Sequence, residues 1–385
     1  MLPGTQVGLP FADAYRGRRI LVTGHRGFKG AWLCQWLRML GAEVRGFGLT
    51  AATTPNLHSE AGLAGSVPDH VGDIRDGAAL AGVLRWAEPE LVFHLAAQPL
   101  VLRSYLEPVE TFAINVVGTA QVLHSIASSS SVRAVIVVTS DKCYAAGPTG
   151  AAHVEADRLG GVDPYSASKA GAELVAACWR QSYWDAGRGP ALATARAGNV
   201  IGGGDWSEDR IVPDLLRACV SGQPARLRRP AAVRPWQHVL EPLAGYLMLG
   251  ARLLDAGSPY AEAWNFGPDS AASRTVAELA REFLHRWVVH GGTPAPPPIG
   301  RVDEPPDGPA ERATLAIDSS TAHRRLGWHP VLQFSEAVDL TASWYARWAS
   351  GRRFNARAGM VEQIRTYERL LVERNAALAR LVSGV

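Results

Sequence analysis

The sequence predicts an α/β fold in which a doubly wound parallel sheet is followed by a smaller mixed lobe. Short apolar runs rich in β-formers alternate with helical patterns from Arg18 to about Val200. These runs are apolar without alternation, which is typical of parallel strands buried on both faces. After Asn199 the chain changes to loops rich in glycine, proline and tryptophan. Such loops predict a second lobe built on the first.

The elements of the first region follow one another in a regular order. The run ILVTG predicts a strand, and the spacing of Trp32, Trp36 and Leu40 on one face predicts a helix from Phe28 to Leu40. Three further strands are expected at residues 42–49, 90–97 and 134–140. One helical stretch is expected at about 108–127. Strands joined by helices in this way favour a parallel sheet covered on both sides.

The second region contains the segments IGGGDW, RRPAAVRPWQH and NFGP, and a proline-rich stretch at 291–298. We therefore expect one domain at 1–198, rejoined by about 232–266, and a smaller lobe at 199–385. Near the end of the chain, Ile364, Tyr367 and Leu371 lie close to helical spacing within residues 360–382. This pattern predicts an amphipathic helix that packs on the body or on a partner.

Composition excludes several classes of protein. Of 385 residues, 47% are hydrophobic and 19% charged, with a net charge of +3, which fits neither a disordered chain nor a polybasic nucleic-acid binder. No apolar run reaches the length of a membrane helix, and no basic stretch followed by an apolar one stands at the start. The four cysteines lack metal-binding spacing. We expect a soluble cytoplasmic protein with free thiols, no metal, and no nucleic-acid or membrane partner.

Lysine is rare in this chain. Lys29, Lys142 and Lys169 are the three lysines among 39 basic residues, so 36 are arginine. Coding bias accounts for an arginine-rich surface. A lysine that remains is a candidate for a position that needs a compact ammonium able to lose its proton near neutral pH.

A glycine motif follows the first predicted strand. Gly24, Gly27 and Gly30 lie at the start of the first helix, where glycine permits a tight turn, close approach of a pyrophosphate and close helix packing. This context predicts dinucleotide binding. The acidic residue expected about 20 positions later to bind ribose is missing from GFGLTAATT. Asp73 either meets the adenine or caps a helix.

Tyr165 and Lys169 lie four residues apart at the start of a helical segment, hence on one face. A neighbouring ammonium favours the phenolate form, and such a tyrosine can take a proton from a sugar hydroxyl while hydride leaves the same carbon. Taken alone, such a pair is usually an ordinary helix face. Together with the glycine motif and the strand ending at Ser140, the pair becomes a specific sign of this proton and hydride chemistry.

Ser140, Asp141 and Lys142 lie where the strand predicted at 134–140 ends. Ligands in open α/β sheets lie outside the carboxyl ends of the strands, so these residues should face the substrate. Ser140 can donate to the sugar oxygen, Asp141 can act as an acid if burial keeps it protonated, and Lys142 can act as a base if its pKa is lowered. The alternative for Lys142 is a solvated loop charge.

The order of these motifs resembles the extended short-chain dehydrogenase/reductase family, whose dinucleotide domain is Rossmann-like. Within it, the narrower segments are similar to the branch of nucleotide-sugar 4,6-dehydratases that act on CDP-glucose. The segments that carry the resemblance are GHRGFKG, GDIRD, HLAAQPLVLRSY, VTSDKCY, LGGVDPYSASK, ARAGNVIGGGDW, RPWQHVLEPLAGY, WNFGP and LGWHP. Most nucleotide-sugar dehydratases carry Asp-Glu where this chain has Asp141-Lys142.

The resemblance implies an internal redox cycle with NAD. Tyr165, Lys169 and Ser140 would oxidise C4 of the hexose, and the new carbonyl would acidify the proton on C5. Water would then leave across C5 and C6, with Asp141 as the acid and Lys142 serving at C5, before hydride returns to C6. The product would be CDP-4-dehydro-6-deoxyglucose. The division of acid and base between Asp141 and Lys142 stays open.

The resemblance also assigns binding residues. For the cofactor it implies the glycine loop with Phe28 and Lys29, the segment Asp73-Ile74, the segment Leu95-Ala96-Ala97, and the Tyr165/Lys169 pair. For the substrate it implies Gln98, Asn199, Arg234 and His238, with Arg103, Asn115 and Tyr105 as weaker candidates. Packing explains Arg103, Asn115 and Tyr105 about as well, and a solvated helix face competes for Lys29. A homodimer through helices of the dinucleotide domain is expected.

Two departures from the family pattern stand out: the small residues between Tyr144 and Glu155, and the proline-rich stretch at 291–298. Two other functions remain open. One is an epimerase or a dehydratase for another nucleoside-diphosphate hexose. The other is a dinucleotide-binding protein without catalysis, although such a protein would not need Ser140, Tyr165 and Lys169.

Overall fold

A seven-stranded parallel sheet in the order β11-β6-β5-β4-β1-β2-β3 forms the centre of the computed structural model, which describes residues 9–146, 151–184, 187–269, 272–301, 315–351 and 354–383. Every adjacent pair is parallel. The strands are β1 (Arg19–Thr23), β2 (Glu43–Gly48), β3 (Asp69–Val71), β4 (Leu91–His94), β5 (Ala134–Val138), β6 (Ala191–Ala197) and β11 (Ala263–Phe266). The predicted doubly wound parallel sheet is confirmed.

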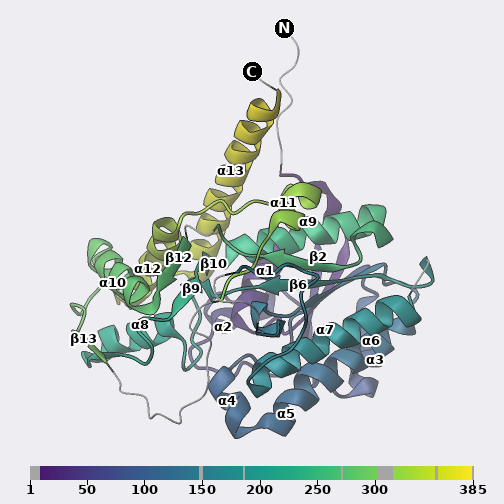
Figure 1. Cartoon of the computed structure of the whole chain (residues 1–385), viewed down its shortest axis with the longest axis horizontal. Coiled ribbons are helices and arrows are strands. Elements are labelled where there is room, and N and C mark those ends of the chain that lie inside the picture. The colour runs from purple at the N-terminus through teal and green to yellow at the C-terminus, as the bar shows by residue number, and fades with distance from the viewer. Residues whose placement is uncertain are drawn as a thin grey trace.

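Helices cover both faces of the sheet (Figure 1). Ile20 and Val22 of β1 pack toward α1 (Phe28–Met39) and α9 (Leu240–Ala256), whereas Leu21 between them faces the opposite core. Successive side chains of a strand point to opposite faces, which is why these strands are apolar throughout. The helices of the opposite face are α3 (Gly77–Ala87), α6 (Gly118–Ala127) and α7 (Pro164–Ser182).

The helical stretch expected at about 108–127 is interrupted by one wider turn. It consists of α5 (Pro108–Phe112), a π-helical turn η3 (Ala113–Val117) and α6. The short helix α4 (Val101–Leu106) precedes it. Asn115 lies in the π turn, and its side chain is buried. Such turns often occur at functional sites.

Helix α11 (Ser320–Leu326) packs on α9 and β11, whereas the smaller lobe contains α8 (Ile211–Ser221), α10 (Val276–Val289) and α12 (Phe334–Ala349). Its strands form three two-stranded sheets: β7 (Val200–Ile201) with β10 (Gln237–His238), β8 (Ala225–Leu227) with β13 (Ile299–Arg301), and β9 (Val233–Pro235) with β12 (Ser273–Thr275). Although α9 and β11 follow this lobe's first strands in sequence, they pack on or extend the large sheet. The chain therefore returns to the first domain.

The last helix, α13 (Ala356–Ser383), projects from the body as the long helix at the top of Figure 1. Its first half packs on α1 through buried Met360, Ile364, Tyr367 and Leu371, and the rings of Tyr367 and Trp36 meet edge to face at 5.6 Å. The predicted amphipathic helix is thus present and packs on the body. None of the helices in the described ranges is long and apolar enough to cross a membrane.

The remaining short elements are α2 (Leu57–Glu60) and the 3₁₀ turns η1 (Ala12–Ala14), η2 (Leu63–Gly65), η4 (Asp141–Cys143) and η6 (Ser258–Tyr260). Of the unusual loop between Tyr144 and Glu155, residues 147–150 lie outside the described residues.

Candidate active site

A cavity of about 310 Å³ lies between the carboxyl ends of the central strands and the smaller lobe. Side chains distant in sequence meet there. Of the residues singled out from the sequence, it brings together Lys29, Ser140, Asp141, Lys142, Tyr165, Asn199 and Arg234. The position agrees with the general rule for ligand sites in open α/β sheets.

The glycine loop connects β1 to α1 beside this cavity. Gly24 has φ +72°, and a Cβ there would stand 2.7 Å from the amide nitrogen of Ala96. A Cβ on Gly30 would stand 2.2 Å from the carbonyl oxygen of Gly24. Neither position accepts a side chain, because the loop is packed between α1 and the segment after β4.

Gly27 is different, because it is exposed and is the N-cap of α1. A Cβ there would meet one atom within 4 Å, the carbonyl oxygen of Gly24 at 3.3 Å. Open space therefore lies in front of the first turn of α1, whose amides have no partners within the helix. A pyrophosphate fits this position by charge and by shape. The residues present fit a dinucleotide such as NAD.

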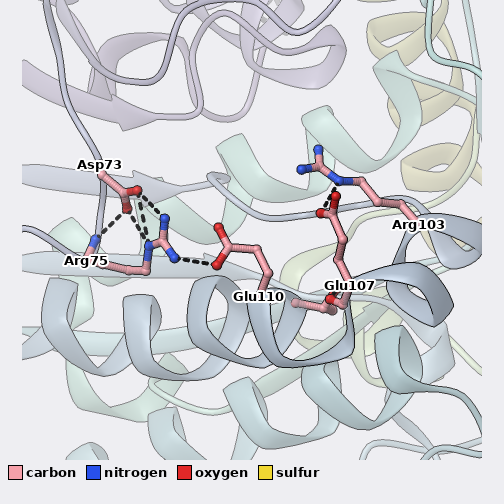
Figure 2. Close-up of polar contacts among 6 residues, drawn as sticks. Asp73, Arg75, Arg103, Glu107 and Glu110 are labelled. Atoms are coloured by element: carbon pink, nitrogen blue, oxygen red, sulfur yellow. Dashed lines mark hydrogen bonds and ion pairs between the residues drawn. The ribbon is translucent and has the colours of Figure 1, made fainter.

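Asp73, which was expected either to contact the adenine or to cap a helix, forms an ion pair with Arg75. Figure 2 shows Arg75 bridging Asp73 and Glu110, with Nη2 to Asp73 Oδ2 at 2.6 Å and Nη1 to Glu110 Oε2 at 2.7 Å. Helix α3 is capped instead by Asp76. Ile74 is buried and lies against Gly118, where a Cβ would stand 2.7 Å from Ile74 Cδ1. Ile74 therefore packs against the start of α6.

Tyr165 and Lys169 lie in the first two turns of α7, and both are buried. Asp163 caps the helix by accepting a hydrogen bond from the Ser166 amide at 2.9 Å, and Pro164 occupies the first helical position. The Tyr165 amide donates to Ser104 Oγ at 3.1 Å, and Lys169 Nζ donates to the Val138 carbonyl at 3.3 Å. The pair is thus tied to α4 at one end and to β5 at the other.

The pKa of Tyr165 shifts in the direction opposite to the one expected. Burial raises it to about 12, although a hydrogen bond to Ser140 and the charge of Arg210 act to lower it. Burial also lowers the pKa of Lys169 to about 8. The desolvation of the phenol thus outweighs the neighbouring cations, and in this state Tyr165 holds its proton at neutral pH.

The strand β5 ends in the turn η4, which presents Ser140, Asp141 and Lys142. Ser140 is the N-cap: its Oγ accepts from the Lys142 amide at 3.2 Å and donates to Asp141 Oδ1 at 3.0 Å. Burial raises the pKa of Asp141, while Lys142, Ser140, Arg234 and Lys29 oppose the rise. Asp141 therefore has the environment of a carboxyl group that can carry a proton at the site.

Lys29 lines the same cavity, so its side chain does not lie on a solvated helix face. Its Nζ lies 5.9 Å from the ring centroid of Tyr246. Burial and the like charges of Arg210 and Lys169 lower its pKa to about 7, and Asp141 opposes this shift. All three lysines of the chain thus reach one site: Lys29 and Lys142 line the cavity, and Lys169 lies behind Tyr165.

A buried network supports Lys169 from behind. Glu173, one turn further along α7, accepts hydrogen bonds from Thr139, from Thr194 Oγ1 at 2.7 Å and from Arg196 Nη2 at 2.8 Å. Its negative charge raises the pKa of Lys169 against the effect of burial. This network ties α7 to β5 and β6.

Several expected substrate residues lie outside the cavity lining. Gln98 and Asn115 hold each other: the Gln98 amide donates to Asn115 Oδ1 at 2.8 Å, and Asn115 Nδ2 donates to the Gln98 carbonyl at 3.0 Å. Arg103 is exposed and pairs with Glu107 at 2.7 Å (Figure 2). His238 is fully buried, with its ring edge to face on Trp32 at 6.1 Å. In this structure Gln98 and Asn115 fix the loop after β4. Arg103 forms a surface ion pair, and His238 packs in the core.

The smaller lobe adds charged residues that the sequence did not single out. Arg210 lines the cavity and pairs with Asp205 at 3.0 Å. Three further arginines, Arg226, Arg228 and Arg229, line it from β8 and the following loop. The sequence did carry one signal for these four arginines, because each lies within or near a motif segment of the smaller lobe. With 36 arginines in the chain, however, residue type alone could not select them.

Comparison with known proteins gives a consistent result. A family described as the NAD dependent epimerase/dehydratase family matches residues 20–261. A CDP-glucose 4,6-dehydratase from Salmonella typhimurium is 41% identical over 341 residues, which cover 88% of this chain and 93% of that protein. A dTDP-glucose 4,6-dehydratase from Xanthomonas campestris is 28% identical, over 84% of this chain and 92% of that protein.

Solved structures agree in fold. A dTDP-glucose 4,6-dehydratase from Streptomyces venezuelae, solved with NAD bound, superposes with a TM-score of 0.70 at 25% identity, over 85% of this chain and 96% of that one. A UDP-glucose 4-epimerase from Thermus thermophilus in complex with NAD gives a TM-score of 0.71 at 23% identity, over 85% of this chain and 98% of that one.

Proposed function

Because the chain belongs to the NAD dependent epimerase/dehydratase family, we propose that it is a lyase that converts CDP-D-glucose to CDP-4-dehydro-6-deoxy-D-glucose and water. The observation that carries the proposal is the presence of Asp141 and Lys142 in the same cavity as Tyr165. Elimination across C5 and C6 needs an acid and a base beyond the group that serves C4. A simple epimerisation at C4 does not need them.

NAD, when bound, supplies the acceptor and later the donor of one hydride, so the reaction has no net redox change. The chain's own residues handle the protons. Tyr165 takes the proton of the 4-hydroxyl in its phenolate form, which a positive charge on Lys169 behind it favours. Lys142 removes the C5 proton, which the neighbouring carbonyl has made acidic, and later donates a proton, exchangeable with solvent, back to C5. Asp141 protonates the departing 6-hydroxyl.

The glycine loop and the segment Leu95-Ala96-Ala97 hold the dinucleotide in this proposal, with Phe28 and Lys29 in the first turn of α1. The substrate enters from the side of the smaller lobe. Arg234 and Arg210 suit the diphosphate, because a guanidinium can bind two phosphate oxygens at once. Asn199, which follows β6 and lines the cavity, is the proposed polar contact to the sugar nucleotide.

Incubation with a panel of nucleoside-diphosphate hexoses, followed by mass spectrometry for the loss of one water, tests the proposal. We expect CDP-glucose to react. If another sugar nucleotide reacts in its place, the substrate assignment is wrong. If the product has the mass of the substrate and an altered configuration, the protein is an epimerase. If no sugar reacts while NAD still binds, it is a dinucleotide-binding protein without this chemistry.

We also propose a homodimer through helices of the first domain. Large apolar side chains are exposed along α4, α5, η3 and α7: Leu106 (83%), Val109 (81%), Val117 (58%) and Leu174 (60%). Burying such a patch against a second copy would remove it from water. Light scattering of Leu174→Glu beside the unaltered protein tests this, because a charge at the interface should lower the measured mass.

A cytoplasmic location is the last part of the proposal. The four cysteines are free thiols, and Cys34, Cys143 and Cys219 are buried. Free thiols are the usual state in a reducing compartment. Fractionation of cells that express a tagged chain tests this.

A further inference from the structure

Two histidines and one aspartate meet beside the glycine loop, outside the active-site cavity. His25 follows Gly24 in that loop, His58 lies in α2, and Asp69 is the first residue of β3. One nitrogen of each ring and one carboxylate oxygen all lie within 4.8 Å of one another. These three residues are not part of the lining of the cavity that contains Tyr165. The cluster is therefore separate from the residues of the proposed reaction.

The local structure explains how the three side chains come together. Strands β2 and β3 are parallel neighbours in which Gly46 pairs with Asp69. Position 46 has no side chain, and a Cβ there would stand 2.4 Å from Cδ2 of the His25 ring. The glycine therefore lets the imidazole lie against β2, next to the Asp69 carboxylate. Glycine inside a strand often marks such a close approach.

Both imidazoles of the cluster are buried. His25 is 0% and His58 3% exposed, and the side chain of Asp69 is 16% exposed. The two rings meet edge to face with centroids 5.3 Å apart. His25 Nδ1 and His58 Nε2 have no hydrogen-bond partner among the residues that the structure describes. Buried polar atoms are normally paired, so two such nitrogens in one cluster indicate a ligand as their partner.

An ion pair within the cluster competes with any ligand. Asp69 Oδ2 lies 2.6 Å from His25 Nε2 and 2.5 Å from Arg26 Nη2. This pairing accounts for the carboxylate, but it does not account for His58, whose Nε2 has no partner within the described ranges. A carboxylate has two oxygens, so Arg26 can keep one of them while an ion takes the other. Carboxylates that bind metal ions are commonly held by a further hydrogen bond of this kind.

From this arrangement we propose that His25, His58 and Asp69 bind one divalent transition-metal ion, of which Zn²⁺ fits the donors best. Imidazole with carboxylate is a common donor set for zinc, whereas Mg²⁺ and Ca²⁺ prefer oxygen ligands. The donors come from three separate segments, so no spacing in the sequence marks them. The ion would join the glycine loop, α2 and β3. It lies outside the cavity, so its role is to hold these segments together.

The protonation states in the cluster suit a metal ion. Burial lowers the pKa of His25, and it lowers that of His58 to about 4. Both rings are therefore neutral at pH 7, which is the form that binds a metal ion.

An ion can enter after small movements of the side chains. Zinc lies about 2.0–2.2 Å from nitrogen and oxygen ligands, so two ligands of a tetrahedral site stand about 3.3–3.5 Å apart. The His25 to Asp69 contact at 2.6 Å must therefore open, and a separation as wide as 4.8 Å must close. The terminal torsions of histidine and aspartate are broad enough to permit both changes. Water takes the fourth position, as is usual where the protein supplies three ligands.

Metal content and thermal unfolding of the whole chain test the proposal without NAD or a sugar nucleotide. Protein stripped with a chelator is dialysed against Zn²⁺ and then against metal-free buffer, and its zinc is measured by atomic absorption. We expect one Zn²⁺ per chain and a higher midpoint of thermal unfolding, because a ligand of the folded state stabilises it. Zinc retention equal to that of His58→Gln would overturn the proposal.

Affinities of variants locate the ion. His58→Gln and Asp69→Asn each remove a ligand and keep a polar side chain, so each should lower Zn²⁺ affinity by at least about tenfold, the lower range for a disturbed ligand set. His124→Gln is the matched control, because His124 is exposed on α6 and should not affect binding. Titration against a chromophoric chelator measures the affinities, and circular dichroism establishes that each variant is folded.

Arg26 separates a metal site from a simple ion pair. Arg26→Gln removes the cation that competes for Asp69, so this variant should bind Zn²⁺ at least as tightly as the unaltered chain. If the cluster is only an ion pair, neither protein takes up zinc there, and the proposal fails.

A measurement on the unaltered, zinc-loaded chain is independent of any variant. X-ray absorption should show ligands at about 2.0–2.1 Å, as for nitrogen and oxygen, and no sulfur at about 2.3 Å. A sulfur ligand would mean that the ion sits on a cysteine such as the exposed Cys178, and it would overturn the site. Neither result bears on the reaction of CDP-glucose, so this proposal and the proposed function fail separately.

Discussion

The two walls of the cavity are built differently. On the wall formed by β5 and α7, the polar side chains are buried and held by short contacts, with Ser140 bonded to Asp141 and Lys169 to the backbone of β5. On the wall formed by the smaller lobe, Arg226 is exposed, and Arg228 pairs with Asp209 at 3.0 Å where both are more than a third exposed. The first wall is fixed before a ligand arrives, whereas the exposed arginines of the second, Arg226 and Arg228, can adjust to one.

This difference indicates a division of labour. Bond-breaking groups must be positioned closely, because small displacements of reacting groups cost large factors in rate. Charges that attract a diphosphate tolerate more movement, since electrostatic attraction falls off slowly with distance. Substitutions on the first wall should therefore lower kcat, and substitutions on the second should raise KM.

The largest effect is expected at Tyr165. Tyr165→Phe removes the hydroxyl that accepts the 4-hydroxyl proton, so kcat should fall about 10³-fold, within the usual range for general acid–base groups. NAD affinity should stay close to that of the unaltered protein, as measured by fluorescence titration. The matched control is Tyr183→Phe at the exposed end of α7, which should keep full activity. Retention of activity by Tyr165→Phe would remove this residue from the mechanism.

Lys142 should give the next largest effect. Lys142→Met removes the base at C5, so solvent deuterium should enter C5 about 10²-fold more slowly, as followed by NMR of the product. Lys142→Arg is the informative partner, because a guanidinium keeps the charge but does not give up its proton. In both variants deuterium should enter C5 at the same low rate. A rate near normal in Lys142→Arg would mean that charge, and not proton removal, is the contribution of Lys142.

Arg234 tests the second wall. Arg234→Lys keeps the charge but loses the fork that binds two phosphate oxygens, so KM for the sugar nucleotide should rise about tenfold with kcat changed less than about twofold. Arg103→Lys is the control, since its exposed ion pair with Glu107 is of a kind that contributes little. A fall in kcat without a change in KM would place Arg234 with the chemistry and would break the proposed division.

The smallest expected effect concerns Lys29, which lies near the junction of the two walls. Its pKa of about 7 means that it is cationic below that pH and loses its charge above it. Affinity for NAD should therefore weaken by a few-fold as pH rises through 7, since one charge-assisted contact to the pyrophosphate is lost. Lys29→Arg should bind tightly and without this pH dependence, and Lys29→Met weakly and without it. Calorimetric titrations at several pH values measure all three, and the same pH dependence in Lys29→Met would exclude Lys29 as its source.

The sequence was most informative where local structure decides position. The glycine loop, the strand ending at Ser140 and the Tyr165/Lys169 spacing each depend on neighbours close in the chain, so pattern alone located them. The lysine count pointed to the site as well, because a rare residue type stands out against a uniform background. The fold class followed from the regular alternation of strands and helices.

Contacts between distant segments could not be read in this way. His238 follows Arg234 closely in one motif, yet β10 pairs with β7 and turns the imidazole into the core. Arg210 reaches the cavity from a loop without periodicity. The sign of the pKa shift at Tyr165 depends on burial, which many segments produce together, and so a nearby ammonium was a poor guide to it.

The clustering of the three lysines also has a practical consequence for spectroscopy. Because every ε-amine of the chain belongs to Lys29, Lys142 or Lys169, uniform isotope labelling of lysine side chains labels this site alone. A spectrum of such a sample should contain three side-chain signals, and each should respond when NAD or a sugar nucleotide is added. The arginine-rich surface stays silent, so proton movements at the site can be followed without background.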